Sequence, residues 1–339
     1  MNSIRRTILI FLFSTLAQSA NPRPVHAENG MVVSSSVWAS EAGVNILKKG
    51  GNAIDAAVAT GFALAVTLPQ AGNIGGGGFM VVHLEDGAEL TLDYREMAPK
   101  AAHRDMFIDD TGGVNRELAL HSHLSSGVPG SVDGLLKVFE DYGSGKVSRQ
   151  QILTSAINLA QNGFPITRRY AALLNWFNDF FARDDGASEI FIRQDGHPWQ
   201  EGDYLVQRDL ARTLKRISKY GRDGFYSGAV ANLIVAEMRE GGGIISHADL
   251  ENYESKYRKP VIGKFHGFDV VSMGPPSSGG ALLIHMLNMT KHFELDSLGW
   301  NSSNYIHVLT EIERRAYADR AEHMGDMDFW KVPLSMIAS

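Results

Sequence analysis

A run of four glycines, Gly75 to Gly78, constrains this chain more than any other feature. It lies between an alanine-rich helical segment and a predicted β-hairpin whose second strand ends in the sequence Asp93-Tyr94-Arg95-Glu96-Met97-Ala98-Pro99. Glycines permit positive φ angles, and they let other atoms approach the backbone where a Cβ would interfere. Arg95 places a permanent cation at the strand end, and its planar fork matches the two oxygens of a carboxylate. The stretch therefore predicts a closely packed loop beside a carboxylate-binding arginine.

The glycine run is not a phosphate-binding loop. Met80 stands where the dinucleotide fingerprint G-x-G-x-x-G requires its third glycine, and the run leads into a strand rather than a helix. No Gly-Lys-Ser or Gly-Lys-Thr occurs in the sequence. We therefore expect no nucleotide cofactor.

Composition narrows the classes of protein that the chain can be. Its 339 residues are 44% hydrophobic, enough to bury a large core as one domain or two. No segment repeats at a fixed period and no long polar tract occurs, so neither a solenoid nor disorder is indicated. The formal charge of −6 argues against nucleic acid as a partner. Because the chain has no cysteine, it forms no disulfides, thiolate metal sites or cysteine nucleophiles.

The N-terminus has the pattern of a secretory leader. Arg5 and Arg6 precede the apolar run Ile8–Leu16, which is too short for a stable membrane anchor. Two short small-residue motifs suited to signal-peptide cleavage end at Ser19 and at Ala27. We expect residues 1–27 to be a signal peptide, residues 28–339 to form the functional part, and the protein to be periplasmic or secreted.

The body of the chain alternates helical and strand-like segments, as in an α/β protein. Asn52 can cap a helix over Ala53–Leu68, with Asp55 near its positive end. This helix is apolar nearly all round, so we expect it to be buried against the face of a central sheet. That sheet would contain the hairpin formed by Phe79–Leu84 and Ala88–Tyr94.

Further elements follow from periodicity and end signals. Ser148 and Gln151 form a capping box for a helix that Gly163 ends. A strand, a turn at His266-Gly267 and a second strand are predicted within Val261–Met273. The other predicted helices are Ser40–Lys49, Ser131–Tyr142, Thr167–Arg183, Arg208–Tyr220, Ala229–Glu240, Ala281–Lys291 and Ser303–Met324.

Two groups of residues invite a metal-site interpretation. Five ligand-type side chains fall within ten residues near the C-terminus, namely Asp319, Glu322, His323, Asp326 and Asp328. A site for a hard cation is one interpretation. The favoured one is a salt-bridged helix end, with Asp319 paired to Arg315 and Glu322 to Arg320 or Lys331. His121 and His123 alternate as on a strand but have no third partner nearby in the sequence, so we predict no metal site.

Nucleophile motifs are equally incomplete. No G-x-S-x-G occurs, so the serine elbow of α/β-hydrolases is absent. Ser277 and Ser278 precede two glycines and could form an oxyanion nest, but a helix-starting turn explains them as well. The residues alone thus indicate one carboxylate-binding arginine and no catalytic residue.

Six ordered segments resemble the large subunit of γ-glutamyltranspeptidases, and the likeness extends from about Gly30 to Pro333. They are GGNAIDAAVA at residues 50–59, PQAGNIGGGGF at 69–79, DYREMAP at 93–99, GVPG at 127–130, PPSSGG at 275–280 and AYADR at 316–320. The resemblance implies an N-terminal-nucleophile hydrolase fold, an αββα sandwich of two stacked sheets between helix layers.

In that family a precursor cleaves itself before a threonine, whose hydroxyl is then the nucleophile and whose own α-amine is the base. The threonine takes the γ-glutamyl group of glutathione or a related amide as an ester, and water, an amino acid or a peptide accepts it. The family's large-subunit arginine that binds the substrate's α-carboxylate matches Arg95. The resemblance implies no metal and no cofactor.

The sequence departs from the family at its end, because Ser339 precedes the expected processing threonine. We therefore expect residues 28–339 to be the large-subunit portion of a single N-terminal-nucleophile hydrolase domain that stops before this threonine. Either the chain is part of a processed enzyme whose C-terminal small subunit, a separate chain, completes the sandwich and supplies the nucleophile, or it is a truncated product. In both cases we expect the chain alone to be inactive. Two other interpretations stay open. One is a same-family acylase for another amide, such as a β-lactam side chain. The other is a non-catalytic secreted fragment that acts as a binding module.

Overall fold

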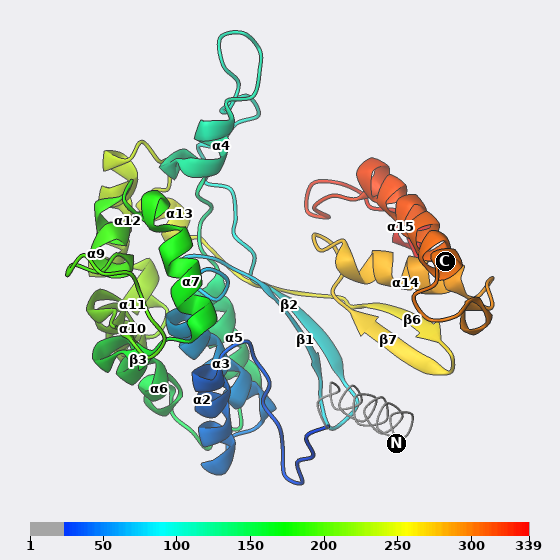
Figure 1. The fold of residues 1–339 in the computed structure, drawn as a ribbon, viewed down its shortest axis with the longest axis horizontal. Coiled ribbons are helices and arrows are strands. Elements are labelled where there is room, and N and C mark those ends of the chain that lie inside the picture. The colour runs from blue at the N-terminus through cyan, green and yellow to red at the C-terminus, as the bar shows by residue number, and fades with distance from the viewer. Residues whose placement is uncertain (1–23, 339) are drawn as a thin grey trace, which may run out of the picture.

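The computed structural model describes residues 24–338, so the predicted leader lies, but for residues 24–27, outside the described part of the chain. Two lobes face each other across a small sheet (Figure 1). The larger lobe is helical, and its core helices are α2 (Val37–Lys48), α3 (Ala53–Thr67), α5 (Ser131–Tyr142), α6 (Arg149–Asn162) and α10 (Arg208–Tyr220). Within residues 24–338, no helix combines the length and apolarity needed to cross a bilayer.

Helix α3 lies at the centre of this lobe. Its predicted cap is confirmed, because Asn52 Oδ1 accepts the Asp55 N–H at 2.9 Å and Asp55 Oδ2 accepts the Asn52 N–H at 2.9 Å. Its burial is confirmed as well, with Phe62 fully buried. The predicted neighbour was wrong, since α3 packs chiefly against α2, α5 and α6 and not on the face of the sheet. An apolar surface all round a helix predicts burial but does not identify what covers it.

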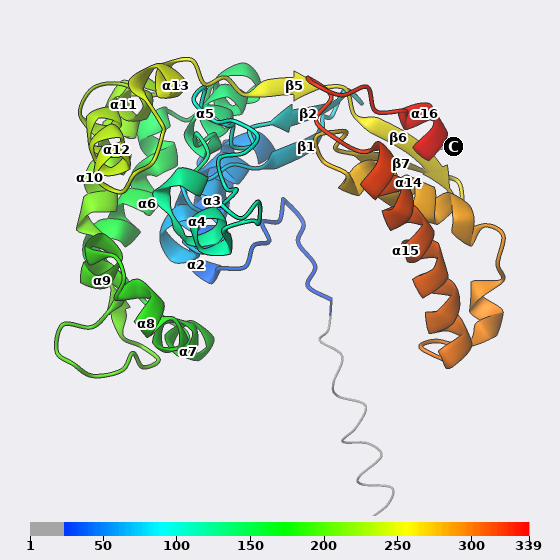
Figure 2. The same cartoon turned by 90° about the horizontal axis from the view of Figure 1, so that it is seen from above.

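The sheet between the lobes is built from the predicted hairpin and one distant strand (Figure 2). Strands β1 (Phe79–His83) and β2 (Glu89–Asp93) pair antiparallel, which confirms the hairpin. Strand β5 (Lys256–Arg258) then pairs antiparallel with β2, placing Lys256 opposite Asp93 and Arg258 opposite Thr91. The end of β2 therefore meets residues that follow it by more than 160 positions.

Helices and short strands cover the rest of the larger lobe. They are α4 (Arg116–His121), η2 (His123–Ser125), α9 (Asp185–Phe191), α11 (Asp223–Tyr226), α12 (Gly228–Glu240), α13 (His247–Glu251) and the pair β3 (Phe164–Pro165) and β4 (Tyr204–Leu205). The predicted helix over 167–183 was wrong in one respect, because it breaks at Phe177 into α7 (Arg168–Trp176) and α8 (Asn178–Phe181). The rings of Phe177, Phe180 and Phe181 pack together at this break. The apolar pattern of the sequence continues across Phe177, so the sequence did not reveal this break.

The smaller lobe has little core. Strands β6 (Val261–Phe265) and β7 (Phe268–Ser272) turn at His266-Gly267 as predicted, and α14 (Gly279–Thr290) packs on them and on α15 (Ser303–His323). A small cluster of Ala281, Val332 and Ile337 is buried there, beside α16 (Leu334–Ile337). Large side chains stay exposed, among them Phe268, Trp300 and Phe329. The described residues thus form only part of the expected two-sheet sandwich.

Candidate functional site

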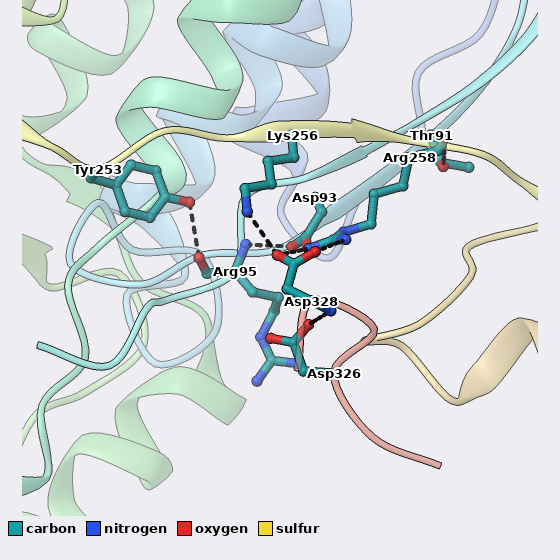
Figure 3. A network of polar contacts seen from close by, with 8 residues as sticks. All are labelled: Thr91, Asp93, Arg95, Tyr253, Lys256, Arg258, Asp326 and Asp328. Atoms are coloured by element: carbon teal, nitrogen blue, oxygen red, sulfur yellow. Dashed lines mark hydrogen bonds and ion pairs between the residues drawn. The ribbon is translucent and has the colours of Figure 1, made fainter. Parts of the chain in front are cut away.

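The backbone of Arg95 is held on both sides where β2 ends (Figure 3). Its N–H donates to Asp93 Oδ1 at 3.0 Å, and its carbonyl oxygen accepts from the Tyr253 hydroxyl at 2.8 Å. Burial raises the pKa of Tyr253, so this hydroxyl stays a donor at neutral pH. The main chain at Arg95 is therefore fixed, whatever its side chain does.

The glycine run packs directly against this segment. A Cβ on Gly77 would lie 2.4 Å from the carbonyl oxygen of Tyr94 and 2.8 Å from the Cα of Arg95. A Cβ on Gly78 would lie 2.9 Å from the Tyr94 ring. The predicted close approach is thus confirmed. Although glycine permits positive φ angles, none of these four residues has one. Absence of a Cβ, and not backbone conformation, is what this loop requires.

A second set of glycines, distant in the sequence, packs against the same segment. A Cβ on Gly130 would lie 2.1 Å from the Tyr94 carbonyl oxygen, one on Gly134 2.4 Å from the Tyr94 Cβ, and one on Gly127 2.8 Å from the Glu96 Cβ. These residues include the GVPG motif and the start of α5. The two sets together form a glycine cage around residues 94–96.

The side chain of Arg95 leaves the cage and remains accessible. It is 57% exposed, its Nε donates to Glu96 Oε2 at 3.1 Å, and its guanidinium lies 5.5 Å from the centre of the Phe79 ring. Among the described residues, its two Nη groups have no hydrogen-bond acceptor. The ion pair with Glu96 therefore uses only Nε, and the two Nη donors remain available to a carboxylate.

A cavity of about 470 Å³ opens beside this fork. Its walls come from the end of β2, from β5 and its preceding loop, and from the segment after α15. The lining residues are Asp93, Arg95, Glu96, Met97, Tyr253, Glu254, Lys256, Arg258, Pro276, Asp326, Asp328 and Phe329. No serine, threonine, cysteine or histidine of the described chain is among them. The cavity can therefore hold a carboxylate, but among the described residues it contains no serine, threonine or cysteine nucleophile and no histidine base.

The wall opposite Arg95 contains an ion-pair network. Both oxygens of Asp328 accept from the two Nη groups of Arg258 at 3.0 Å, and Lys256 Nζ donates to Asp328 Oδ2 at 2.7 Å. Arg258 Nε donates to Asp93 Oδ2 at 2.6 Å. The hydrogen bonds from Arg258 and then from Lys256 hold the pKa of the Asp328 carboxyl well below its ordinary value of 3.8. The hydrogen bond to Asp328 raises the pKa of Arg258, with that to Asp93 acting in the same direction.

The acidic group at the end of α15 is thus divided between two places. Asp328 belongs to the cavity wall, whereas Asp319 pairs with His285 of α14 at 3.0 Å. The predicted partner Arg315 binds Glu311 instead, and Arg320 donates to Ser278 at 3.0 Å. The pairings predicted for the helix end were therefore wrong, because α15 packs against α14 and meets partners there.

The Ser277-Ser278 turn is explained by local contacts. Ser277 Oγ accepts the Gly279 N–H at 3.3 Å, and Ser278 Oγ accepts from Arg320. These bonds fit the turn that starts α14, and they tie the PPSSGG segment to the AYADR segment of α15. Only Pro276 of this turn reaches the cavity.

The structure does give His123 the partners that the sequence did not reveal. Ligand-type atoms of His123, Asp184 and Glu237 lie within 4.8 Å of one another. His123 Nε2 already bonds Glu237 Oε1 at 2.8 Å, while Asp184 caps α9. The two carboxylates are exposed and each of the three side chains already has a hydrogen-bond partner, so we assign no metal to them. His121 lies apart, against the Phe180 ring.

We predict that Gly77→Ala destabilises the protein by about 1–3 kcal/mol, the usual cost of forcing a methyl group into packed atoms. The matched control is Gly75→Ala in the same loop, where the nearest atom to a Cβ is 3.5 Å away, and its effect should stay within about 0.5 kcal/mol. Urea unfolding of both variants measures the difference. Equal stability of the two variants would contradict the glycine cage.

We predict a pH dependence from Asp328. Because its pKa is lower in the folded protein than the ordinary 3.8, its pairing stabilises the fold fully above about pH 5 and progressively less as the pH falls below 3.8. The gap in urea midpoint between wild type and Asp328→Asn should therefore be constant from pH 7 to 5 and narrow below 4. Asp110→Asn, in an exposed loop, is the control. A gap that widens in acid would refute this assignment.

Comparison with known proteins agrees with the predicted resemblance. The sequence profile of the family Gamma-glutamyltranspeptidase matches residues 39–339. A glutathione hydrolase proenzyme of Pseudomonas sp. (strain A14) is 46% identical over 317 residues, covering 94% of this chain and 55% of that protein. The Acylase ACY 1 proenzyme of Pseudomonas sp. (strain SE83) is 35% identical over 321 residues, covering 93% of this chain and 57% of that protein.

A solved structure gives the same relationship. The crystal structure of Helicobacter pylori gamma-glutamyltranspeptidase matches with a TM-score of 0.90 and 44% identity, covering 94% of this chain and 90% of that chain. The predicted α/β, N-terminal-nucleophile hydrolase fold class is confirmed by this match. The chain spans about half the length of the curated relatives it matches. It belongs to the gamma-glutamyltranspeptidase family.

Proposed function

We propose that this chain is the large subunit of a γ-glutamyltransferase or glutathione hydrolase. The observation that carries the proposal is the guanidinium of Arg95 with its free Nη donors, whose backbone the glycine cage holds beside a cavity that has no threonine of its own among the described residues. In the proposed reaction, Arg95 binds the α-carboxylate of glutathione or another γ-glutamyl compound. Charge-assisted, bidentate contacts of this kind fix orientation as well as affinity.

The chemical step then belongs to a threonine on a C-terminal small subunit. Its hydroxyl attacks the γ-carbonyl carbon while its α-amine takes the hydroxyl proton. The α-amine then passes this proton to the amide nitrogen, the C–N bond breaks, and the nitrogen leaves as a neutral amine. Water, an amino acid or a peptide then takes the γ-glutamyl group from the ester and regenerates the threonine. The acids around Arg95 do not supply this nucleophile, which agrees with our assignment of no catalytic residue to this chain. No metal or cofactor enters the scheme.

The surface of the smaller lobe supports a protein partner of this kind. Phe268, Trp300 and Phe329 are 74%, 85% and 87% exposed, and the buried cluster beside them is small. Large apolar side chains left this exposed, in a lobe with so small a core, are sites that a partner could cover. We propose that the small subunit covers this lobe and completes a single hydrolase domain of which residues 28–339 are part.

The predicted leader supports a site of action outside the cytoplasm. If residues 1–27 direct export and are removed, the enzyme acts in the periplasm or in the medium. A chain without cysteines needs no oxidation to fold there.

A same-family acylase is the second candidate, and the relative named Acylase ACY 1 proenzyme supports it. Higher identity to the glutathione hydrolase proenzyme favours the first. A non-catalytic binding fragment is the third. It would bind γ-glutamyl compounds without converting them, even with a small subunit present.

The first prediction from this proposal concerns dependence on the partner. The purified 339-residue chain should release no p-nitroaniline from L-γ-glutamyl-p-nitroanilide, because the nucleophile lies elsewhere. Coexpression with the C-terminal part of the Pseudomonas proenzyme, starting at its nucleophilic threonine, should give low but measurable turnover. Turnover by the chain alone would overturn the proposal. Release from a β-lactam side-chain amide but not from the γ-glutamyl anilide would favour the acylase.

The second prediction concerns Arg95 in that two-subunit complex. Arg95→Ala should lower kcat/KM for the γ-glutamyl anilide by about one to two powers of ten, since a hydrogen bond to a charged group contributes about 1.5–3 kcal/mol. Arg95→Lys keeps the charge but loses the fork, so it should recover only part of the loss.

The control for Arg95 is 4-aminobutanoyl-p-nitroanilide, the same substrate without the α-carboxylate. Wild type and Arg95→Ala should both react with it slowly and at similar rates. Equal losses on both anilides, together with a lower melting temperature, would instead assign Arg95 a structural role beside Glu96.

A further inference from the structure

We infer that Asp328 is a positioning and specificity-determining residue for the Arg95 site, acting through Arg258 and Asp93. This inference rests on the proposed function for its kinetic part. It assigns a role to the segment after α15, which lies more than 230 residues from Arg95 in the sequence.

The side chains of Asp328, Arg258 and Asp93 form one continuous path of contacts to the backbone of Arg95 (Figure 3). Asp328 binds the Nη edge of Arg258 with both oxygens, at 3.0 Å each. Arg258 Nε binds Asp93 Oδ2 at 2.6 Å, and the other Asp93 oxygen accepts the Arg95 N–H at 3.0 Å. Each oxygen of Asp93 thus has a different task, one toward Arg258 and one toward Arg95. A shift of Arg258 therefore reaches the backbone of Arg95 through a single carboxylate.

Burial makes this path stiff. The side chains of Arg258 and Asp93 are only 15% and 8% exposed, so water substitutes poorly for either partner. Asp328 itself is held in place by Lys256 and by the N–H that Asp328 donates to Asp326 Oδ1 at 2.9 Å. The network pairs two acids, Asp93 and Asp328, with two bases, Lys256 and Arg258. Loss of Asp328 would leave the buried guanidinium of Arg258 with one of its two acidic partners, Asp93.

Asp328 also decides which arginine is free. Arg95 and Arg258 both line the cavity, and each carries a fork that fits a carboxylate. Asp328 occupies the Nη edge of Arg258, whereas the Nη edge of Arg95 has no acceptor among the described residues. The cavity therefore presents a single guanidinium with free Nη donors, that of Arg95, and a substrate carboxylate has a single place to bind. Without Asp328, a second fork would compete for the same carboxylate and hold it away from Arg95.

The test uses Asp328→Asn, with Asp269→Asn as the matched control. Asp269 pairs with Lys264 at 3.4 Å in the same lobe but on the exposed β6–β7 hairpin, outside the cavity. In the two-subunit complex, Asp328→Asn should raise KM for the γ-glutamyl anilide about tenfold, as misplacement of a binding group does, with kcat changed less than about threefold. The substitution should leave the kcat and KM for 4-aminobutanoyl-p-nitroanilide unchanged. Asp328→Glu should recover part of the loss, and Asp269→Asn should match wild type.

A second readout needs no activity. Hydrogen–deuterium exchange of the 339-residue chain should be faster at residues 94–98 in Asp328→Asn than in wild type or Asp269→Asn. Exchange in α3 should stay unchanged and so report an intact core. If the wild-type complex fails to turn over the γ-glutamyl anilide, the proposed function falls, while this measurement still decides the coupling.

Two outcomes would overturn the inference. One is unchanged exchange at residues 94–98 with unchanged KM. The other is an equal loss on both anilides with faster exchange throughout the chain, which would reduce Asp328 to a structural clamp between the lobes.

Discussion

The contact on which the site depends is the packing of residues 94–96 between backbones that carry no Cβ. Gly77 and Gly130 both approach the carbonyl oxygen of Tyr94, and Gly134 packs against its side chain. Tyr94 is buried so well by this packing that the pKa of its hydroxyl is raised. A strand end would ordinarily fray, but here the cage fixes the peptide while leaving the next side chain outside. This combination of a rigid main chain and an exposed guanidinium gives Arg95 its character as a binding group.

Electrostatics then select what can bind. Acids outnumber bases on the cavity wall, which alone would repel an anion. Two of the three bases are already neutralised, because Lys256 and Arg258 both bind Asp328. Arg95 keeps its Nη donors unpaired among the described residues, so attraction for a carboxylate is confined to one point of an otherwise acidic surface. Acidic surroundings also suit a ligand that carries an amine near its carboxylate, as the proposed γ-glutamyl substrate does.

The sequence predicted well the features that depend on residues close to one another along the chain. The capping boxes at Asn52 and Ser148 form as expected, because each depends on residues three positions apart. The hairpin, the helix ends and the accessible fork of Arg95 also follow from local chemistry. The glycine run was interpreted correctly as a site of close approach, although the sequence shows only that a Cβ is absent and not which atoms pack in its place.

The parts that could not be predicted depend on distant pairing. Tyr253 and Arg258 come to the site on β5 and its loop, and a three-residue strand leaves almost no periodic signal. Asp328 was visible as an acid, but its local neighbours suggested a salt-bridged helix end. Only the pairing of β5 with β2 shows that its partner is Arg258. Likewise, Asp319 has an arginine four residues before it, yet the packing of α15 on α14 brings His285 closer.

In the proposed enzyme, the order of the smaller lobe would depend on the subunit that packs on it. The smaller lobe buries a small apolar cluster and is joined to the larger one through β5 and the Arg258 network. A lobe with so little core gains much of its order from what packs on it. A small subunit that covers the exposed side chains of this lobe would therefore also fix the segment that carries Asp328. Through Arg258 and Asp93, the same event would fix Arg95, so that assembly and substrate binding depend on one network of charges.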